Sequence, residues 1–167
     1  MTFGLPHIST AAVAVIAGLW APVVEVPEPE HVFPIRGEHD LGRTATNSFG
    51  GGRGHQGQDM FADCGTPIAA PTDGVVRRAV SGDPVAGNHL VVEDAGSGDE
   101  YVFMHLESAP RHRVGERVEA DERIGAVGIS GNAQGCHLHF ERWTAPGWQR
   151  GEVRDPLPLL KRWKRLR

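Results

Sequence analysis

The sequence predicts a single all-β domain, a sandwich or barrel of short strands followed by a short C-terminal helix. Its 167 residues fit one domain, because domains usually hold about 100–200 residues. Its 22 glycines and 12 prolines are a high proportion of turn-forming residues, which favours short strands joined by turns. Short apolar or alternating runs recur between those turns, and this pattern is typical of an all-β fold.

The N-terminal segment, residues 1–32, is expected to be an apolar leader followed by a linker. Residues 8–24 are almost entirely apolar, and Pro22, Pro27 and Pro29 then break the chain into an extended acidic stretch. The apolar run resembles the hydrophobic part of a signal peptide, although no lysine or arginine precedes Arg36. A weak hydrophobic anchor is the alternative. Either way, we expect a protein that is secreted or held at the cell envelope.

Four apolar runs after residue 70 are expected to be strands, because each is short and bounded by glycine-rich turns. They are Val75-Val76, Leu90–Val92, Tyr101–Met104 and His137–Phe140. A helix is expected to follow Asp155 and Pro156, because aspartate caps helices and proline fits the first turn. Its apolar side chains should form one face, with cations on the other. They are Leu159, Leu160, Trp163 and Leu166.

The charge distribution argues against nucleic acid as a partner. The formal net charge is −4, although five cations stand in the last seven residues, 161–167. The body is therefore acidic with a basic tail, whereas nucleic-acid binding requires a broad basic face. The tail is instead expected to contact an anionic envelope surface. Nine histidines are the one compositional excess, and they indicate metal or proton chemistry.

Four histidines and one aspartate stand where they could share a metal site. His55 and Asp59 stand four residues apart in a glycine-rich loop that can bend both side chains toward one ion. His137 and His139 alternate along an expected strand and therefore share one face. His105 ends another expected strand. One loop histidine, one aspartate and one strand histidine would give three protein ligands and an open fourth position, which is the arrangement of a catalytic zinc.

These motifs resemble the LytM- and lysostaphin-type zinc endopeptidases that cut bacterial peptidoglycan, over about residues 33–160. The matching motifs are His55-x-x-x-Asp59, Tyr101-x-x-x-His105-Leu106, and Gly131-Asn132 followed by His137-Leu138-His139-Phe140-Glu141. The resemblance implies that His55, Asp59 and His139 bind one Zn²⁺ per chain. It also implies that His105 and His137 flank a zinc-activated water and supply acid–base catalysis.

The same resemblance implies the architecture and the partner. The fold would be a compact antiparallel β-sheet structure, a barrel-like sandwich of the LytM type with its duplicated hybrid motif. The loops 42–54, 81–88 and 107–115 would wall a groove for peptidoglycan peptides. Residues 33–160 would form the catalytic domain and residues 161–167 a basic tail. The protein is expected to act as a monomer.

Three neighbouring residues leave alternatives open. Cys64 and Cys136 are compatible with a disulfide that would fasten the two sides of the metal site, or with two reduced thiols. A cysteine replacing a histidine ligand is a third interpretation. Glu141 lies on the same face as His139 by strand alternation, where it could orient a ligand imidazole, although it could equally be a surface glutamate.

Three functions other than hydrolysis share some of these sequence features. The segment 70–76 also looks like part of a lipoyl or biotinyl carrier domain, but such domains need a modifiable lysine and none precedes Lys161. A histidine phosphocarrier would have no use for His55 and Asp59 as ligands. The remaining alternative is a non-hydrolytic domain of the same fold that binds peptidoglycan or activates an amidase. All five expected site residues are present, which favours an enzyme.

Overall fold

The computed structural model describes residues 31–52 and 54–166, so the leader expected in residues 1–30 lies outside the described residues. Within them the chain forms nine strands and one α-helix. The elements in chain order are β1 (Gln58–Phe61), β2 (Pro67–Ala69), β3 (Gly74–Asp83), β4 (Gly87–Asp94), β5 (Glu100–Leu106), β6 (Arg117–Val118), β7 (Arg123–Ala126), β8 (His137–Trp143), β9 (Val153–Arg154) and α1 (Leu157–Arg165). The four strands expected from the sequence are all present, and the all-β prediction is confirmed.

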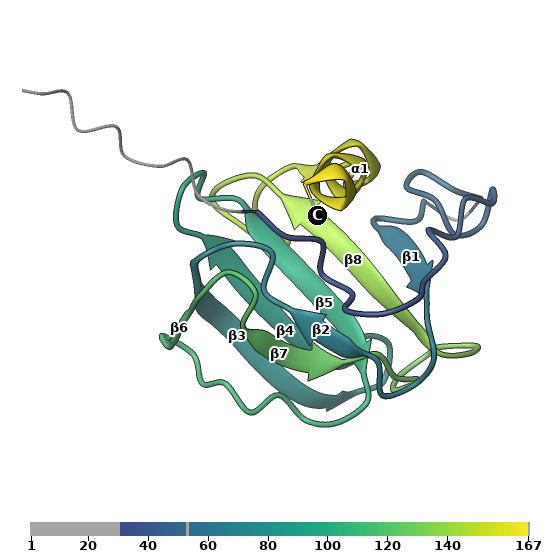
Figure 1. The fold of residues 1–167 in the computed structure, drawn as a ribbon, viewed down its shortest axis with the longest axis horizontal. Helices are drawn as coiled ribbons and strands as arrows, with labels where there is room; N and C mark the ends of the chain where they lie inside the picture. Colours follow the sequence, from purple (N-terminus) through teal and green to yellow (C-terminus); the bar gives the residue numbers. More distant parts are fainter. Residues whose placement is uncertain (1–30, 53, 167) are drawn as a thin grey trace, which may run out of the picture.

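The strands form two antiparallel sheets. The larger has seven strands in the order β1-β8-β5-β4-β3-β6, with β9 paired to β8. The smaller consists of β2 and β7, and Figure 1 shows it lying across the face of the larger sheet at β4 and β5. The segment that precedes β1 is tied to the small sheet by a bridge between Ile35 and Ile68. The sheets are thus arranged as two layers, as predicted.

The main hydrophobic core lies on the face of the large sheet that the small sheet covers. Alternation along β5 and β8 places Phe103, Leu138 and Phe140 on this face, and all three are fully buried. Ile68 and Ile124 face them from β2 and β7 as members of the same buried cluster. Burying this apolar area is the dominant stabilising term for a domain of this size.

The helix α1 closes one end of the core. The helix has Pro156 at its N-cap, one residue later than expected, with no side-chain cap hydrogen bond, although the Asp155 carboxylate accepts a hydrogen bond from Leu157 N at 2.9 Å. Leu160 and Trp163 are buried as predicted, and the Trp163 ring packs edge-on against Tyr101 at 5.4 Å between centroids. Leu166 is 61% exposed, which corrects the prediction for that residue. The helix ends at Arg165, so Leu166 no longer continues the apolar face.

The opposite face of the large sheet carries a second, smaller apolar cluster. Val102 and Met104 of β5 and Trp143 of β8 pack there with Trp148, from the connection between β8 and β9. Because one strand face serves the main core and the other this cluster, the central strands are buried on both sides. His137 and His139 lie on this second face, so the apolar cluster packs beside them.

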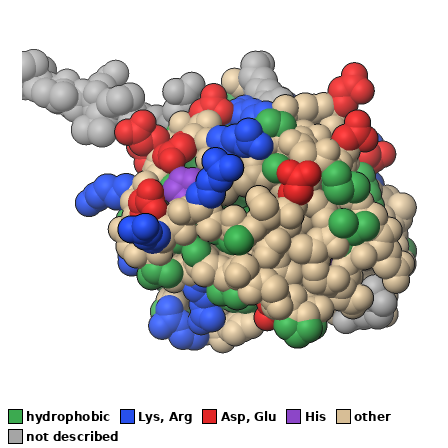
Figure 2. Space-filling view, turned by 90° about the horizontal axis from the view of Figure 1, so that it is seen from below, with side chains coloured by type: hydrophobic (Ala, Val, Ile, Leu, Met, Phe, Trp, Pro, Cys, Tyr) green, Lys and Arg blue, Asp and Glu red, His purple; other side chains and the backbone are tan. Residues whose placement is uncertain are grey.

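The surface of the molecule is mixed in character. On the face seen from below, acidic and basic side chains lie interspersed among scattered apolar ones (Figure 2). Cys64 and Cys136 form a disulfide with their Cα atoms 5.2 Å apart, so neither cysteine is available as a metal ligand. Within the described residues, no helix is long and apolar enough to cross a membrane.

Candidate metal centre and active site

The pairing of β1 with β8 brings the first two candidate ligands together. In the antiparallel register Asp59 lies directly opposite His139, so their side chains project side by side from one face. The loop before β1 then folds back and delivers His55 to the same point. Gly57 makes this approach feasible, because a Cβ built there would lie 2.7 Å from His139 Nε2.

The three ligand atoms form a nearly equilateral triangle. His55 Nε2 is 3.1 Å from Asp59 Oδ1 and 3.0 Å from His139 Nδ1, and the third side measures 2.9 Å. In a tetrahedral zinc site with bonds of 2.0–2.1 Å, neighbouring ligand atoms stand about 3.3 Å apart. The observed triangle is therefore close to the size that zinc requires. Among the described residues, this is the group whose ligand atoms could share one ion.

The other nitrogen of each ligand histidine is held by an acceptor. His55 Nδ1 lies 3.1 Å from the Ser48 carbonyl oxygen, and His139 Nε2 lies 3.0 Å from Glu141 Oε1. Because these partners only accept, each of those nitrogens carries a proton, which leaves His55 Nε2 and His139 Nδ1 as the nitrogens that could bind a metal ion. Two imidazole nitrogens and a carboxylate oxygen within 3.1 Å of one another form a donor set that fits a metal ion, which would replace a proton on His139 Nδ1.

The electrostatics of the ligands reflect the same convergence. Burial alone would raise the pKa of Asp59, but hydrogen bonds and charge interactions with His139 and His55 outweigh it and lower that pKa well below its usual range. Burial alone would lower the pKa of His139, but its contacts with Asp59 and Glu141 raise it to about 9. Both shifts show that the centre favours positive charge next to the Asp59 carboxylate.

Two further histidines lie beside the triangle with their tautomers fixed. His105 Nδ1 donates to the Ser130 carbonyl at 2.8 Å, and His137 Nδ1 donates to the Gly135 carbonyl at 2.9 Å. The Nε2 atom of each is thereby left as the acceptor. The two rings stand 4.7 Å apart between centroids, and His137 Nε2 is 3.8 Å from Asp59 Oδ1. Burial lowers the pKa of His105 to about 4, so its ring is neutral at neutral pH.

His105 reaches the site through an unusual backbone conformation. Simple alternation along β5 would send its side chain to the main core with Phe103, while Met104 would face the site. The backbone at His105 has φ = 64°, in the left-handed region that residues other than glycine seldom occupy. The strand twists there, so that His105 joins His137 on the site face while Leu106 remains buried. Such strained positions are common at functional sites.

All five of these side chains were predicted from the sequence, and the structure brings them together. The three backbone carbonyls that fix the histidine tautomers, at Ser48, Ser130 and Gly135, were not predicted. The loop that carries two of them was not predicted either, although the glycines at 128, 131 and 135 were a signal for a tight loop. The sequence left the role of Glu141 open, and the structure shows Glu141 to be 3% exposed and bonded to His139.

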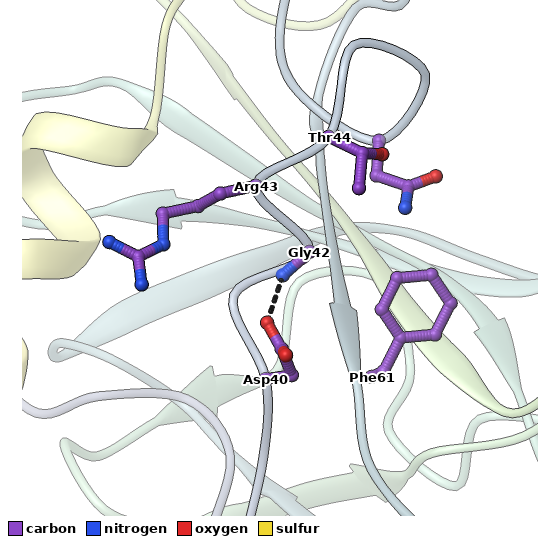
Figure 3. A pocket seen from close by; sticks show the side chains of 6 residues that line it. Asp40, Gly42, Arg43, Thr44 and Phe61 are labelled. Atoms are coloured by element: carbon purple, nitrogen blue, oxygen red, sulfur yellow. Dashed lines mark hydrogen bonds between the residues drawn. The ribbon is translucent and has the colours of Figure 1, made fainter.

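The loop 42–54 borders the site, and part of it lines an open pocket of about 680 Å³ together with Asp40 and Phe61. Figure 3 shows Arg43 extending on the side of α1 and Phe61 lying on the opposite side, while the Asp40 carboxylate accepts a hydrogen bond from Gly42 N. The Phe61 ring also lies 5.6 Å from that of His137. Gln58 holds this loop against β1, because its buried amide donates to the carbonyl oxygens of Leu41 and Asn47. This wall of the site is therefore anchored to the strand that carries Asp59.

A two-layer antiparallel fold with a His-Asp-His triangle and two further histidines beside it defines the class of the protein, a metallopeptidase of the LytM and lysostaphin type. Residues 53–156 match Peptidase family M23, and the chain belongs to that family.

Similar proteins and structures agree with this assignment. Glycyl-glycine endopeptidase ALE-1 of Staphylococcus capitis is 37% identical over 111 residues, 66% of this chain and 30% of that protein. The L-Ala–D-Glu endopeptidase of Bacillus subtilis is 32% identical over 148 residues, 81% of this chain and 44% of that protein. The structure of lysostaphin from Staphylococcus simulans superposes with a TM-score of 0.65 at 28% identity, covering 80% of this chain and 54% of that one. The chain thus spans less than half the length of these two curated relatives.

Proposed function

We propose that this protein is a zinc-dependent endopeptidase that hydrolyses peptide cross-links or stem peptides of bacterial cell-wall peptidoglycan. The observation that carries the proposal is the triangle of ligand atoms, with sides of 2.9–3.1 Å, beside two histidines whose Nε2 atoms are free to accept. The names of relatives support the substrate class. They include a glycyl-glycine endopeptidase, an L-Ala–D-Glu endopeptidase and a peptidoglycan DD-endopeptidase of Vibrio cholerae.

His55, Asp59 and His139 would hold one Zn²⁺ per chain through Nε2, a carboxylate oxygen and Nδ1 respectively. Bound zinc would polarise the scissile carbonyl and lower the pKa of a bound water toward 7. The histidines on the other side would handle protons. The ring of His105 is neutral, so its Nε2 can take a proton as water attacks the amide carbon. His137, once protonated at Nε2, would donate to the oxygen that becomes negative in the tetrahedral intermediate.

The test combines metal content with peptide hydrolysis. Purified protein should contain one equivalent of zinc and release new amino groups from purified peptidoglycan, and a chelator should abolish that release. His139→Ala should lose zinc and activity together, whereas His105→Ala and His137→Ala should keep zinc and lose most turnover. Normal digestion by His105→Ala would refute the proposed acid–base role.

The same experiment separates hydrolysis from the alternative of a non-hydrolytic domain that binds peptidoglycan or activates an amidase. Zinc bound at one equivalent without any release of amino groups would favour that alternative. Absence of zinc would instead refute the ligand assignment. The presence of all five site residues in one cluster supports hydrolysis.

The setting of the enzyme follows from its substrate. We propose that it acts outside the cytoplasm, as a secreted or envelope protein, with residues 33–160 as the catalytic domain of a monomer. Four basic residues form part of α1 and lie on its exposed side, away from buried Leu160 and Trp163: Lys161, Arg162, Lys164 and Arg165. This arrangement supports contact between the C-terminal tail and an anionic envelope surface. Salt-dependent sedimentation with cell walls, lost when the tail lysines and arginines are changed to glutamine, would test it.

A further inference from the structure

Glu141 and Trp143 stand behind the ligand histidine, on the same face of β8. The Glu141 carboxylate receives His139 Nε2 on one oxygen at 3.0 Å and Trp143 Nε1 on the other at 2.7 Å. Glu141 is 3% exposed and Trp143 6% exposed, so water does not compete for either bond. The two bonds fix the carboxylate from both sides.

From this geometry we infer that Glu141, held in place by Trp143, is a positioning residue that keeps the His139 proton on Nε2 and so presents the Nδ1 lone pair to the metal. The inference deepens the proposed function and rests on its metal site. Glu141 would not touch the metal or the substrate, and it would act only through His139. An acceptor behind a ligand histidine fixes both the tautomer and the orientation of the ring, and its loss typically weakens metal binding about 10–100-fold.

Trp143 requires an acceptor at position 141 in addition to the one that His139 requires, and a glutamine at that position could not accept from both. An indole N–H can only donate, so the group facing it must be an acceptor. In Glu141→Gln the side-chain amide has one oxygen and one NH₂ group. If the oxygen faces His139, the NH₂ group meets the indole N–H, and two donors oppose each other. If the amide flips, its NH₂ group faces His139 Nε2 and forces the His139 proton onto Nδ1, where it blocks the metal.

The position of Trp143 also explains how the pair is held. Trp143 packs in the second apolar cluster with Val102, Met104 and Trp148. The Glu100 carboxylate accepts the backbone N–H of Trp148 at 2.6 Å and anchors the loop that covers this cluster. The orientation of the metal ligand is thereby linked to a packed part of the sheet rather than to a surface loop.

The experiment measures zinc affinity by chelator competition, so it does not depend on peptide hydrolysis. Glu141→Ala should bind zinc about 10–100-fold more weakly than the unaltered protein. Trp143→Phe should stay within about threefold, because Glu141 still accepts from His139. Glu141→Gln should be weakened at least about tenfold, and adding Trp143→Phe should recover a large part of that loss, because the opposing donor is gone.

A spectroscopic readout and a matched control accompany the affinities. In the zinc-loaded protein the His139 Nε2 proton should give a slowly exchanging NMR signal, which disappears in Glu141→Ala. Glu100→Gln is the control, since Glu100 is another buried glutamate of the same sheet that accepts a hydrogen bond from the Trp148 backbone. It should lower the free energy of unfolding and leave zinc affinity within about threefold.

The outcomes distinguish this inference from the proposed function. Equal zinc affinity in Glu141→Gln and in its combination with Trp143→Phe would overturn the role of Glu141, as would a Glu141→Ala variant within threefold of the unaltered protein. Either result would leave the metal site intact. If Glu141→Ala does not fold, the comparison of Glu141→Gln with and without Trp143→Phe still decides. A protein that binds no zinc would overturn both proposals.

Discussion

Removing the disulfide should destabilise the protein by several kcal/mol. Cys64 and Cys136 are 72 residues apart in sequence, so the bridge closes a loop that covers β2 to β7. In the chain-entropy treatment, a cross-link of this span removes about 15 cal/mol/K from the unfolded state, or about 4 kcal/mol at 25 °C. Measured effects tend to fall below that figure, so we expect a loss of about 2–4 kcal/mol for Cys64→Ala/Cys136→Ala. A typical domain has only about 5–15 kcal/mol in total.

Urea unfolding followed by tryptophan fluorescence would measure this loss, with chelator present in every sample so that zinc binding does not contribute. Reduction of the unaltered protein should shift its midpoint to that of the double variant, and reductant should leave the double variant unchanged. Denatured, unreduced protein should contain no free thiol. The loop-entropy reasoning would be refuted if the free energies of unfolding of the double variant and the unaltered protein differed by less than 1 kcal/mol. This comparison requires that the unaltered protein contain no free thiol.

Two further changes test the close packing of the centre and its acid–base properties. Gly57→Ala should weaken zinc binding at least about tenfold, because the new Cβ would overlap His139, whereas Gly52→Ala, with open space around it, should bind zinc normally. The free energy of unfolding of the zinc-free protein should fall as pH drops from 6.5 toward 4, by up to about 3 kcal/mol, because unfolded His105 gains a proton that the buried ring does not. His105→Gln should flatten this part of the pH curve, and parallel curves would contradict the assigned pKa.

Much of the fold could be predicted because its strands have a simple pattern. The runs at residues 90–92, 101–104 and 137–140 are short, apolar and separated by glycine turns, and each became the centre of a strand. The histidine pair on β8 was equally accessible, since alternation requires His137 and His139 to share a face. The exposed position of Leu166 could not be read in this way, because helix periodicity does not indicate the residue at which the helix stops.

The parts of the site that escaped prediction depend on the backbone. The Ser48, Ser130 and Gly135 carbonyls fix histidine tautomers, but every residue has a carbonyl, so the sequence contains no signal for which ones serve. His105 lies on the site face only because of its positive φ, whereas strand parity alone would have placed it in the core. The resemblance to known peptidases identified His105, and the local physics of β5 explains how it arrives there.

The distribution of the proposed ligands over the fold suggests how the proposed catalysis and its specificity are connected. Asp59 and His139 lie on paired strands, and Glu141 fixes His139 from within the sheet, so these two ligands are insulated from changes in the loops. His55 differs, because its Nδ1 is held by a carbonyl of the loop 42–54, which also walls the cavity beside the site. Changes in this loop that alter substrate choice should therefore also alter zinc affinity through His55. The loop 107–115 provides no hydrogen bond to any of the four site histidines among the described contacts, so equivalent changes there should leave zinc affinity unchanged.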